Sequence, residues 1–448
     1  MFDFVCTIFL HGTVGAVKRY RFMKFVYIGF GISFPMAHSI SVQSGHNVLT
    51  ISLITILFFG IMGYIREIPL RKKRQDWKSI FEELKLETKE RATYFLYEKD
   101  ISTYSSEVSI KTIIPLNVWH SKKADLEMRL NQKIIIIKQD TTNNQIIKII
   151  IQNEPLANKI DWQDKFIDKT NNFLNIGISY LGFAYMDLEK YPHAFIAGET
   201  GSGKSNILKC LIHQSLAKNY DVVLIDFKRG VSFSSFSDLL DIHYDYSSVT
   251  KILDDMVNET NKRLDLFRTH KVDNLKAYNS TSSNYLSRKI IFIDELAELL
   301  KTRDKAISNR LYDSIETLTR ISRAVGIHLI MGIQRPDSTI VSGQIKNNVS
   351  FRICGRFVDK EPSRIMIGSD EASHLPNVKG RFIIKDDELY EVQSFYYTDS
   401  DISYLEPEVK EDIPTAPEPQ VEEQKEVPPP KSEKISSELD FDFSDIKK

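Results

Sequence analysis

Cysteine is scarce in this chain of 448 residues, which contains only Cys6, Cys210 and Cys354. The three lie far apart in the sequence, and none has the spacing of a metal-ligand pair. The ten histidines form no cluster either. The sequence therefore offers no metal centre built from cysteine and histidine, and its isolated thiols are typical of a chain whose bulk lies in a reducing cytoplasm.

A large net charge is also missing, because 59 Lys and Arg balance 60 Asp and Glu to a net charge of -1. This balance hides an asymmetry. Residues 406–445 include thirteen acidic side chains, whereas only six lysines lie in residues 410–448. The rest of the chain is therefore net positive. Two interpretations stay open: a soluble core with an acidic tail, or a core that meets a polyanion.

Glycine is absent from the C-terminal segment, which instead carries seven prolines and many carboxylates. We expect residues 401–448 to form a disordered, acidic, proline-rich tail. Its last part, SSELDFDFSDIKK, alternates acidic and apolar residues. The tail is either a solubilising device or an extended spacer that ends in a docking peptide for a basic partner, such as a relaxase or a secretion-channel protein.

Charged residues are missing from two apolar stretches near the N-terminus, at about residues 25–42 and 47–65. Each stretch is long enough to cross a bilayer as a helix, since about 20 residues suffice. Lysines and arginines flank the pair on both outer sides, and the connection at residues 43–46 has none. This asymmetry predicts a hairpin with both ends cytoplasmic. Residues 1–75 are therefore expected to form a membrane region with two transmembrane helices; a buried soluble hairpin is the alternative.

The next segment, residues 76–179, predicts a small α+β or β-rich module. It opens with a charged, helix-like stretch and then reads KIIIIKQDTTNNQIIKIIIQ, two β-branched runs around a polar turn. This pattern is typical of a β-hairpin. The module carries no residues that indicate a reaction.

Residues 180–400 predict an α/β motor domain. Short apolar strands alternate with helical stretches there: HAFIAG, VVLIDF, KIIFIDE, HLIMGIQ, FRICGRF and RFIIK. Uninterrupted apolar strands of this kind favour a parallel sheet that is covered on both faces.

The segment GETGSGKS matches the phosphate-binding pattern GxxxxGK[ST] and lies between an apolar strand and a helix. Its glycines allow backbone N–H groups to curl around phosphate oxygens. Lys204 would reach the β- and γ-phosphates, and the Ser205 hydroxyl would bind Mg²⁺. ATP and Mg²⁺ are therefore the expected cofactors. The expected ATP-binding residues are Gly198, Glu199, Thr200, Gly201, Ser202, Gly203, Lys204 and Ser205.

Two further strands end in polar residues that suit the same site. In KIIFIDELAEL, Asp294 is placed to act as the partner of Mg²⁺, and Glu295 as the general base that activates water. In HLIMGIQRP, the amide of Gln334 could sense the γ-phosphate or hold the water. The alternatives are an acidic helix start and an ordinary strand-end cap.

Taken together, these segments resemble the FtsK/SpoIIIE family. The resemblance covers about half of the chain and includes VVLIDFKRG and the stretch SRAVGIHLIMGIQRPDSTIVSGQIKNNVSFRICGRF. It implies a RecA-like P-loop motor that forms a homo-hexameric ring around duplex DNA and pulls the DNA through by ATP hydrolysis. In such a ring a neighbour's arginine can reach the γ-phosphate. Arg323 fits the family pattern best, and Arg320 and Arg364 are the other candidates.

The family's chromosome translocases differ from this chain, because they carry a winged-helix domain after the motor and usually four membrane helices. A two-helix version that ends in a tail looks more like the coupling ATPases of Gram-positive integrative conjugative elements. The expected function is that of a membrane-anchored, ATP-driven DNA translocase that delivers DNA to a conjugation channel. A chromosome or plasmid partition translocase and a protein-secretion ATPase of the same fold remain alternatives.

DNA contacts without base specificity need cations that can reach phosphates. A basic segment, KTRDKAISNR, follows the acidic strand end, and GQIKNN supplies one more lysine. For each of these side chains an ordinary solvated surface position is the alternative. The candidate DNA-binding residues are Lys301, Arg303, Lys305, Arg310 and Lys346.

The membrane hairpin predicts the sidedness of the N-terminal region. Reporter fusions at residues 15 and 80 should both give a cytoplasmic signal, and a tag near Ser44 should be exposed outside the cell, because the cations flank the hairpin on one side. An external signal from the fusion at residue 80 would contradict the hairpin.

Overall fold

The computed structural model describes residues 73, 75–87, 92–337, 340 and 343–405. The two expected membrane helices, at 25–42 and 47–65, lie outside the described residues, and so does the acidic tail from residue 406 onward. Within the described part of the chain no helix is long and apolar enough to cross a membrane.

The first described unit is a small antiparallel sheet with the strand order β1-β2-β4-β3. Trp77, Phe81, Trp119 and Leu126 come from the helical parts of this unit and pack with the apolar side chains of the strands in one core. Strands β3 and β4 pair antiparallel, which confirms the expected hairpin. The elements are β1 (Tyr94–Ser102), β2 (Ser105–Lys111), α4 (Leu116–Ser121), α5 (Lys123–Leu130), β3 (Ile134–Gln139) and β4 (Ile146–Gln152).

The second unit is built on an eleven-stranded sheet, in which the path β10-β9-β11-β12-β8-β13-β14-β15-β6-β7 is joined by β5 pairing with β15. The strands are β5 (Ile160–Asp161), β6 (Phe173–Ser179), β7 (Gly182–Asp187), β8 (His193–Ala197), β9 (Asp221–Ile225), β10 (Ile242–His243), β11 (Lys289–Ile293), β12 (Ile327–Ile333), β13 (Phe351–Gly355), β14 (Arg381–Lys385) and β15 (Leu389–Tyr396). Strands β5 and β6 precede residue 180, where the sequence placed the start of the motor.

The large sheet is mixed, so the expectation of a parallel sheet is wrong for one half of it. Neighbouring strands along the path β10-β9-β11-β12-β8-β13 pair parallel, whereas β13 pairs antiparallel with β14. Strands β14, β15, β6 and β7 pair antiparallel. The segment RFIIK, expected as a parallel strand, is β14. Only residues 386–388 separate it from β15, and so short a connection can join only antiparallel strands.

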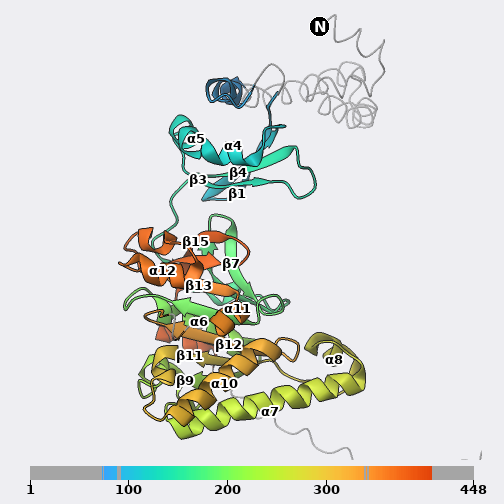
Figure 1. Ribbon diagram of the computed structural model, residues 1–448, viewed down its shortest axis with the longest axis vertical. Coiled ribbons are helices and arrows are strands. Elements are labelled where there is room, and N and C mark those ends of the chain that lie inside the picture. Colours follow the sequence, from blue (N-terminus) through green and yellow to red (C-terminus); the bar gives the residue numbers. More distant parts are fainter. Residues whose placement is uncertain (1–72, 74, 88–91, 338–339, 341–342, 406–448) are drawn as a thin grey trace, which may run out of the picture. The chain divides into compact units, whose positions relative to one another are not determined.

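Helices cover both faces of this sheet. Helix α6 packs Ile207, Leu208 and Leu211 into the core on one face. Helices α7 and α10 pack on the other, with Leu253 and Leu311 in the second core, and Figure 1 shows the two helices side by side. The helices are α6 (Lys204–Ala217), α7 (Tyr246–His270), α8 (Leu275–Thr281), α9 (Leu296–Leu300), α10 (Lys305–Ile321), α11 (Gly343–Asn348) and α12 (Lys360–Ile367), with the 3-10 turns η1 (Asp164–Phe166), η2 (Val231–Phe236), η3 (Glu371–His374) and η4 (Asp399–Leu405).

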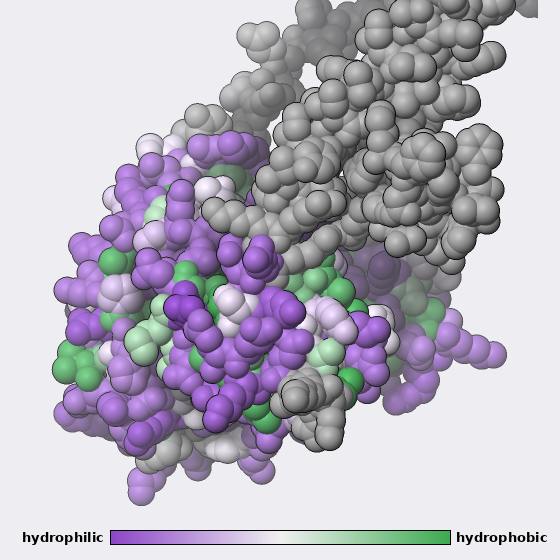
Figure 2. All heavy atoms as spheres, turned by 90° about the horizontal axis from the view of Figure 1, so that it is seen from above, coloured by the Kyte–Doolittle hydropathy of each residue, from purple (hydrophilic) through white to green (hydrophobic). Residues whose placement is uncertain are grey.

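Local sequence explains where the long helices begin. The side chain of Asp245 accepts a hydrogen bond from the backbone N–H of Ser248 at the start of α7, and Asp304 caps α10 in the same way. Such caps satisfy donors that a helix leaves unpaired at its first turn. The described surface visible in Figure 2 is mainly hydrophilic with apolar residues scattered over it, as is usual for a folded protein.

Candidate nucleotide-binding site

The phosphate loop, residues 198–205, leaves the carboxyl end of β8 and enters the first turn of α6. Gly201 and Gly203 adopt φ angles of 86° and 107°, which only glycine takes without strain. The loop is backed by a second glycine turn: the N–H of Gly380 donates to the carbonyl of Ser202 at 2.8 Å. A Cβ at Gly203 would lie 3.1 Å from the nitrogen of Gly380. The glycine spacing seen in the sequence is therefore required by the backbone.

Lys204, Asp294, Glu295 and Gln334 meet at the same edge of the sheet, since β8, β11 and β12 are parallel and adjacent. Lys204 is 4% exposed, Asp294 is 0% exposed and Glu295 is 7% exposed. The Lys204 amino group lies 3.3 Å from Asp294 Oδ1 and 3.6 Å from Glu295 Oε2. It also donates to the backbone carbonyl of Asp294. The structure thus brings one buried lysine onto two buried carboxylates.

The other oxygen of Asp294 has its own partners. Oδ2 accepts from the amino group of Lys228 at 2.8 Å and from the hydroxyl of Ser232 at 2.9 Å. Burial by itself would raise the pKa of Asp294, but Lys204, Lys228 and Ser232 outweigh burial and lower the pKa. Asp294 therefore stays ionised, as a residue that binds or orients a cation must.

Glu295 has the opposite balance. Burial raises the pKa of Glu295, although Lys204 and the N–H of Gln334 act against the rise. That N–H donates to both carboxylate oxygens, at 3.1 and 2.9 Å. A raised pKa makes the carboxylate a better proton acceptor near neutral pH. The contact from Gln334 is made by its backbone, and the role predicted for its side-chain amide stays a prediction.

Asp226 and its loop form a part of the site to which sequence reasoning gave no role. Asp226 directly follows β9 and is 1% exposed. It accepts from the N–H groups of Lys228 and Ser232, at 2.9 and 2.8 Å. These bonds fold the loop so that both side chains reach Asp294. The available signal was a carboxylate that directly follows a buried strand in VVLIDFKRG, the same position that Asp294 holds after its own strand.

The donors around the loop suit a nucleoside triphosphate. The hydroxyl of Ser202 is buried and has no hydrogen-bond partner among the described residues. A cavity borders the loop, and Arg356 and Lys379 are among its lining residues, whereas the third cation there, Arg381, is paired with Glu391. Its lining is Glu199, Thr200, Gly201, Ser202, Arg356, Pro376, Asn377, Val378, Lys379 and Arg381. Cations and free N–H or O–H donors are what phosphate oxygens require. The residues fit a bound phosphate chain, with Ser205 and Asp294 as the groups that would hold its Mg²⁺.

Arg323 lies at the opposite edge of the sheet. It precedes β12, whereas the phosphate loop follows the carboxyl end of the neighbouring β8. The seven residues of β12 span about 23 Å, so Arg323 does not reach the phosphate loop of its own chain. Its Nε donates to the carbonyl of Glu189 at 3.3 Å, and the Glu189 carboxylate lies 3.3 Å from Arg288.

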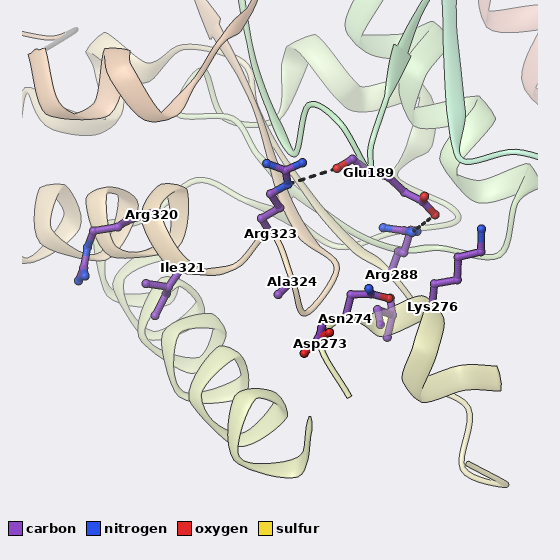
Figure 3. Close-up of a pocket in the computed structure, with 10 residues that line it drawn as sticks. Glu189, Asp273, Asn274, Lys276, Arg288, Arg320, Ile321, Arg323 and Ala324 are labelled. Atoms are coloured by element: carbon purple, nitrogen blue, oxygen red, sulfur yellow. Dashed lines mark hydrogen bonds and ion pairs between the residues drawn. The ribbon is translucent and has the colours of Figure 1, made fainter. Parts of the chain in front are cut away.

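Figure 3 shows these groups in a cavity of about 500 Å³. Its lining consists of Glu189, Asp273, Asn274, Leu275, Lys276, Arg288, Arg320, Ile321, Arg323 and Ala324. Arg320 and Arg323 line this cavity together. Arg364 instead lies on α12, where it pairs with Asp370 at 3.5 Å.

The candidate DNA-binding residues differ in exposure. Lys301, Arg303 and Lys305 are exposed; the first two lie between α9 and α10, and Lys305 is the first residue of α10. Arg310, on α10, pairs with Asp254 at 2.5 Å. Lys346, on α11, is half-buried. Burial lowers the pKa of Lys346, and the positive charges of Arg352 and Lys385 lower it further. The segment at residues 301–305 is thus the part of this set most open to a ligand.

Comparison with known proteins identifies the family. The FtsK/SpoIIIE family model matches residues 177–338. The chain is also similar to the solved structure of the pCW3 conjugation coupling protein TcpA, in monomer form with ATPγS. The two share 34% sequence identity with a TM-score of 0.55, over 74% of this chain and 96% of that chain. The chain belongs to the FtsK/SpoIIIE family of ATPases.

Curated members of the family are longer than this chain. The DNA translocase FtsK of Campylobacter jejuni is 30% identical over 289 residues, which cover 60% of this chain and 29% of that protein. The DNA translocase FtsK of Staphylococcus aureus is 28% identical over 332 residues, with 65% and 41% covered. This FtsK/SpoIIIE member therefore spans well under half the length of those relatives.

Close packing at Gly332 generates a prediction about the site. A Cβ added there would lie 2.1 Å from the carbonyl oxygen of Asp294 and 2.9 Å from the amino group of Lys204. Gly332→Ala should lower ATP turnover roughly 100-fold, because small displacements of reacting groups cost that much. Gly343→Ala is the matched control, since a Cβ there meets nothing within 4 Å. Equal turnover in the two variants would show that this contact does not set the geometry of the site.

Proposed function

We propose that this protein is a membrane-anchored, ATP-driven DNA translocase that acts as the coupling protein of a conjugation system. The likeness to the conjugation coupling protein TcpA, at 34% identity over 96% of that chain, carries the proposal. The nucleotide site supports it, because a phosphate loop, an ionised Asp294 and a buried Glu295 share one sheet edge. Partition of a chromosome or plasmid and secretion of protein are the competing functions.

The chain's own groups divide the work of hydrolysis. Lys204 would exchange its contacts with Asp294 and Glu295 for the β- and γ-phosphates, and Ser205 and Asp294 would hold Mg²⁺. Glu295 would accept a proton from the attacking water. The N–H of Gln334 holds the Glu295 carboxylate in place. Bound Mg²⁺ supplies charge stabilisation of the transferred phosphoryl group. The two lysines on Asp294 keep that carboxylate ionised before the cation binds.

The positions of the phosphate loop and Arg323 support a ring arrangement. The phosphate loop lies at one edge and Arg323 at the other, so Arg323 can serve only a neighbouring subunit's phosphates. A closed ring of identical subunits, with a homo-hexamer as the family's form, pairs one edge of each subunit with the other edge of the next. Arg323 is proposed as the arginine acting in trans, with Arg320 and Arg364 as alternatives.

The substrate is proposed to be DNA bound without strong sequence preference. Lys301, Arg303 and Lys305 are exposed and follow the strand that carries the catalytic carboxylates. Because they follow Glu295 closely in the chain, contacts between these cations and DNA phosphates would affect the position of the Glu295 carboxylate. Residues 1–75 are proposed as the membrane anchor with the motor in the cytoplasm. The acidic tail is proposed as a contact for a relaxase or a secretion-channel protein.

Hydrolysis can be separated from nucleotide binding by two substitutions. Lys204→Ala should lose ATP binding, because the β- and γ-phosphates lose their cation. Glu295→Gln should still bind ATP but turn it over at least 100-fold more slowly, since an amide does not accept the proton of water. The measurements are ATP affinity and steady-state turnover of the full-length protein. Turnover of Glu295→Gln at the normal rate would remove the assignment of the base.

Stimulation of ATPase activity distinguishes a DNA motor from a secretion motor. DNA of arbitrary sequence should raise turnover, and its binding should weaken steeply with salt because phosphate contacts release counterions. Replacing Lys301, Arg303 and Lys305 together by Gln should reduce the salt dependence and the stimulation. Stimulation by a secreted polypeptide but not by DNA would favour the secretion ATPase. Conjugative transfer from donor cells that carry Glu295→Gln, compared with plasmid partition in the same cells, separates the two DNA functions.

A further inference from the structure

Arg323 lies in a tightly built turn. Residues 322–326, here called the arginine turn, connect the end of α10 to the start of β12. The Ser322 hydroxyl donates to the carbonyl of Ile327 at 2.7 Å, and Gly326 has a φ angle of 73°, which favours glycine. The Arg323 side chain within this turn is exposed. The backbone of the turn therefore sets the position from which this side chain can reach another subunit.

Two neighbouring helices anchor the backbone of the arginine turn. The guanidinium of Arg263, a buried residue of α7, donates to the carbonyl of Val325 at 2.9 Å. The N–H of Leu275, at the start of α8, donates to the carbonyl of Ala324 at 2.9 Å. Neither bond involves the side chain of Arg323, so its guanidinium needs a support of its own.

The loop between β7 and β8 supplies that support. The Nε of Arg323 donates to the carbonyl of Glu189 at 3.3 Å, as Figure 3 shows. The Glu189 carboxylate lies 3.3 Å from the guanidinium of Arg288 and accepts from the side-chain amide of Asn172 at 2.8 Å. The two terminal nitrogens of Arg323 have no hydrogen-bond partner among the described residues. They are therefore available to the oxygens of a phosphate.

Arg288 is fixed from the core of the sheet. Its side chain is buried, and a buried cation requires partners. Nη1 of Arg288 lies 3.1 Å from Nε2 of His328 on β12, and Nδ1 of His328 lies 2.9 Å from the carbonyl of Pro192. The carbonyl can only accept, so Nδ1 carries the proton and Nε2 accepts from Arg288. Burial and the charge of Arg288 lower the pKa of His328, and the ring stays neutral in this role.

We propose that Glu189, held by Arg288, is the positioning residue for Arg323 when this arginine acts on the phosphates of a neighbouring subunit. An error of about 1 Å in the placement of a catalytic group can cost 100-fold in rate. The Glu189 carbonyl holds Nε, and the Glu189 carboxylate ties that carbonyl through Arg288 to the core. The inference rests on the proposed function, because it requires a ring in which Arg323 acts in trans.

Replacement of the Glu189 side chain, which is exposed, tests this role without opening the core. Glu189→Ala should lower ATP turnover of the full-length protein roughly 10- to 100-fold and leave ATP affinity unchanged, because the phosphate loop of each subunit is intact. Glu189→Gln should keep most of the turnover, since its amide oxygen can still accept from Arg288. Glu388→Ala is the matched control, because Glu388 is exposed in the turn between β14 and β15 and has no ion pair among the described residues.

Mixtures of two impaired variants separate positioning from support of the fold. Subunits with Glu295→Gln hydrolyse ATP poorly at their own site but present an intact arginine turn to the neighbour. Mixed in equal amounts with Glu189→Ala, they should restore roughly a quarter of the wild-type turnover, because half of the sites are competent and half of these face an intact turn. Glu189→Ala mixed with Arg323→Ala should show no gain over the separate proteins.

Wild-type turnover of Glu189→Ala would overturn the positioning role. A loss that the mixture with Glu295→Gln does not recover would overturn it too, because Glu189 would then act only within its own subunit. Arg323→Ala mixed with Glu295→Gln checks the trans arginine itself and should recover. If this mixture recovers and the Glu189→Ala mixture does not, only the positioning role fails. If neither recovers, Arg323 does not act in trans, and that part of the proposed function fails as well.

Discussion

The contact between the Lys204 amino group and the buried pair Asp294 and Glu295 is the interaction on which the site depends. A buried charge is tolerated only when it is paired and hydrogen-bonded. Here the pairing needs three strands at once, because β8 supplies the loop with the lysine, β11 supplies the carboxylates and β12 supplies the N–H that holds Glu295. A shift of any one strand would leave a buried charge without a partner. The relative positions of the parallel strands and the pairing of the catalytic side chains therefore depend on each other.

The pairing also extends beyond these strands. Strand β9 contributes Asp226, whose loop places Lys228 and Ser232 on Asp294. Lys204, Lys228 and Ser232 lower the pKa of Asp294 despite its burial, whereas burial raises the pKa of Glu295 more than Lys204, Lys228 and the N–H of Gln334 lower it. Asp294 and Glu295 are adjacent at the end of β11, and their surroundings thus give them different proton affinities. That difference suits one carboxylate to a cation and the other to a proton.

Much of the site could be predicted from the sequence, because its main groups sit in local patterns. The phosphate loop, Asp294 and Glu295 each directly follow an apolar strand, and parallel strands bring their ends to one edge. Strand direction could not be read in the same way. The run RFIIK has the same apolar character as the strands of the parallel half, and only the short turn to β15 indicates that it is antiparallel. Lys228 escaped notice because its role depends on a contact with Asp294, a residue far along the chain. The membrane hairpin lies outside the described residues and stays a prediction.

The route by which the chain leaves the motor has a mechanical consequence. After β15 the backbone runs along α6, where Tyr397 lies 3.0 Å from His213 and Asp399 pairs with Lys209 at 2.7 Å. Helix α6 begins at Lys204, so residue 405 is tethered within a few helical turns of the phosphates. The chain that continues beyond residue 405 is therefore covalently tethered near the nucleotide-binding edge of the sheet. The length of that continuation sets the effective concentration of its far end at the nucleotide site.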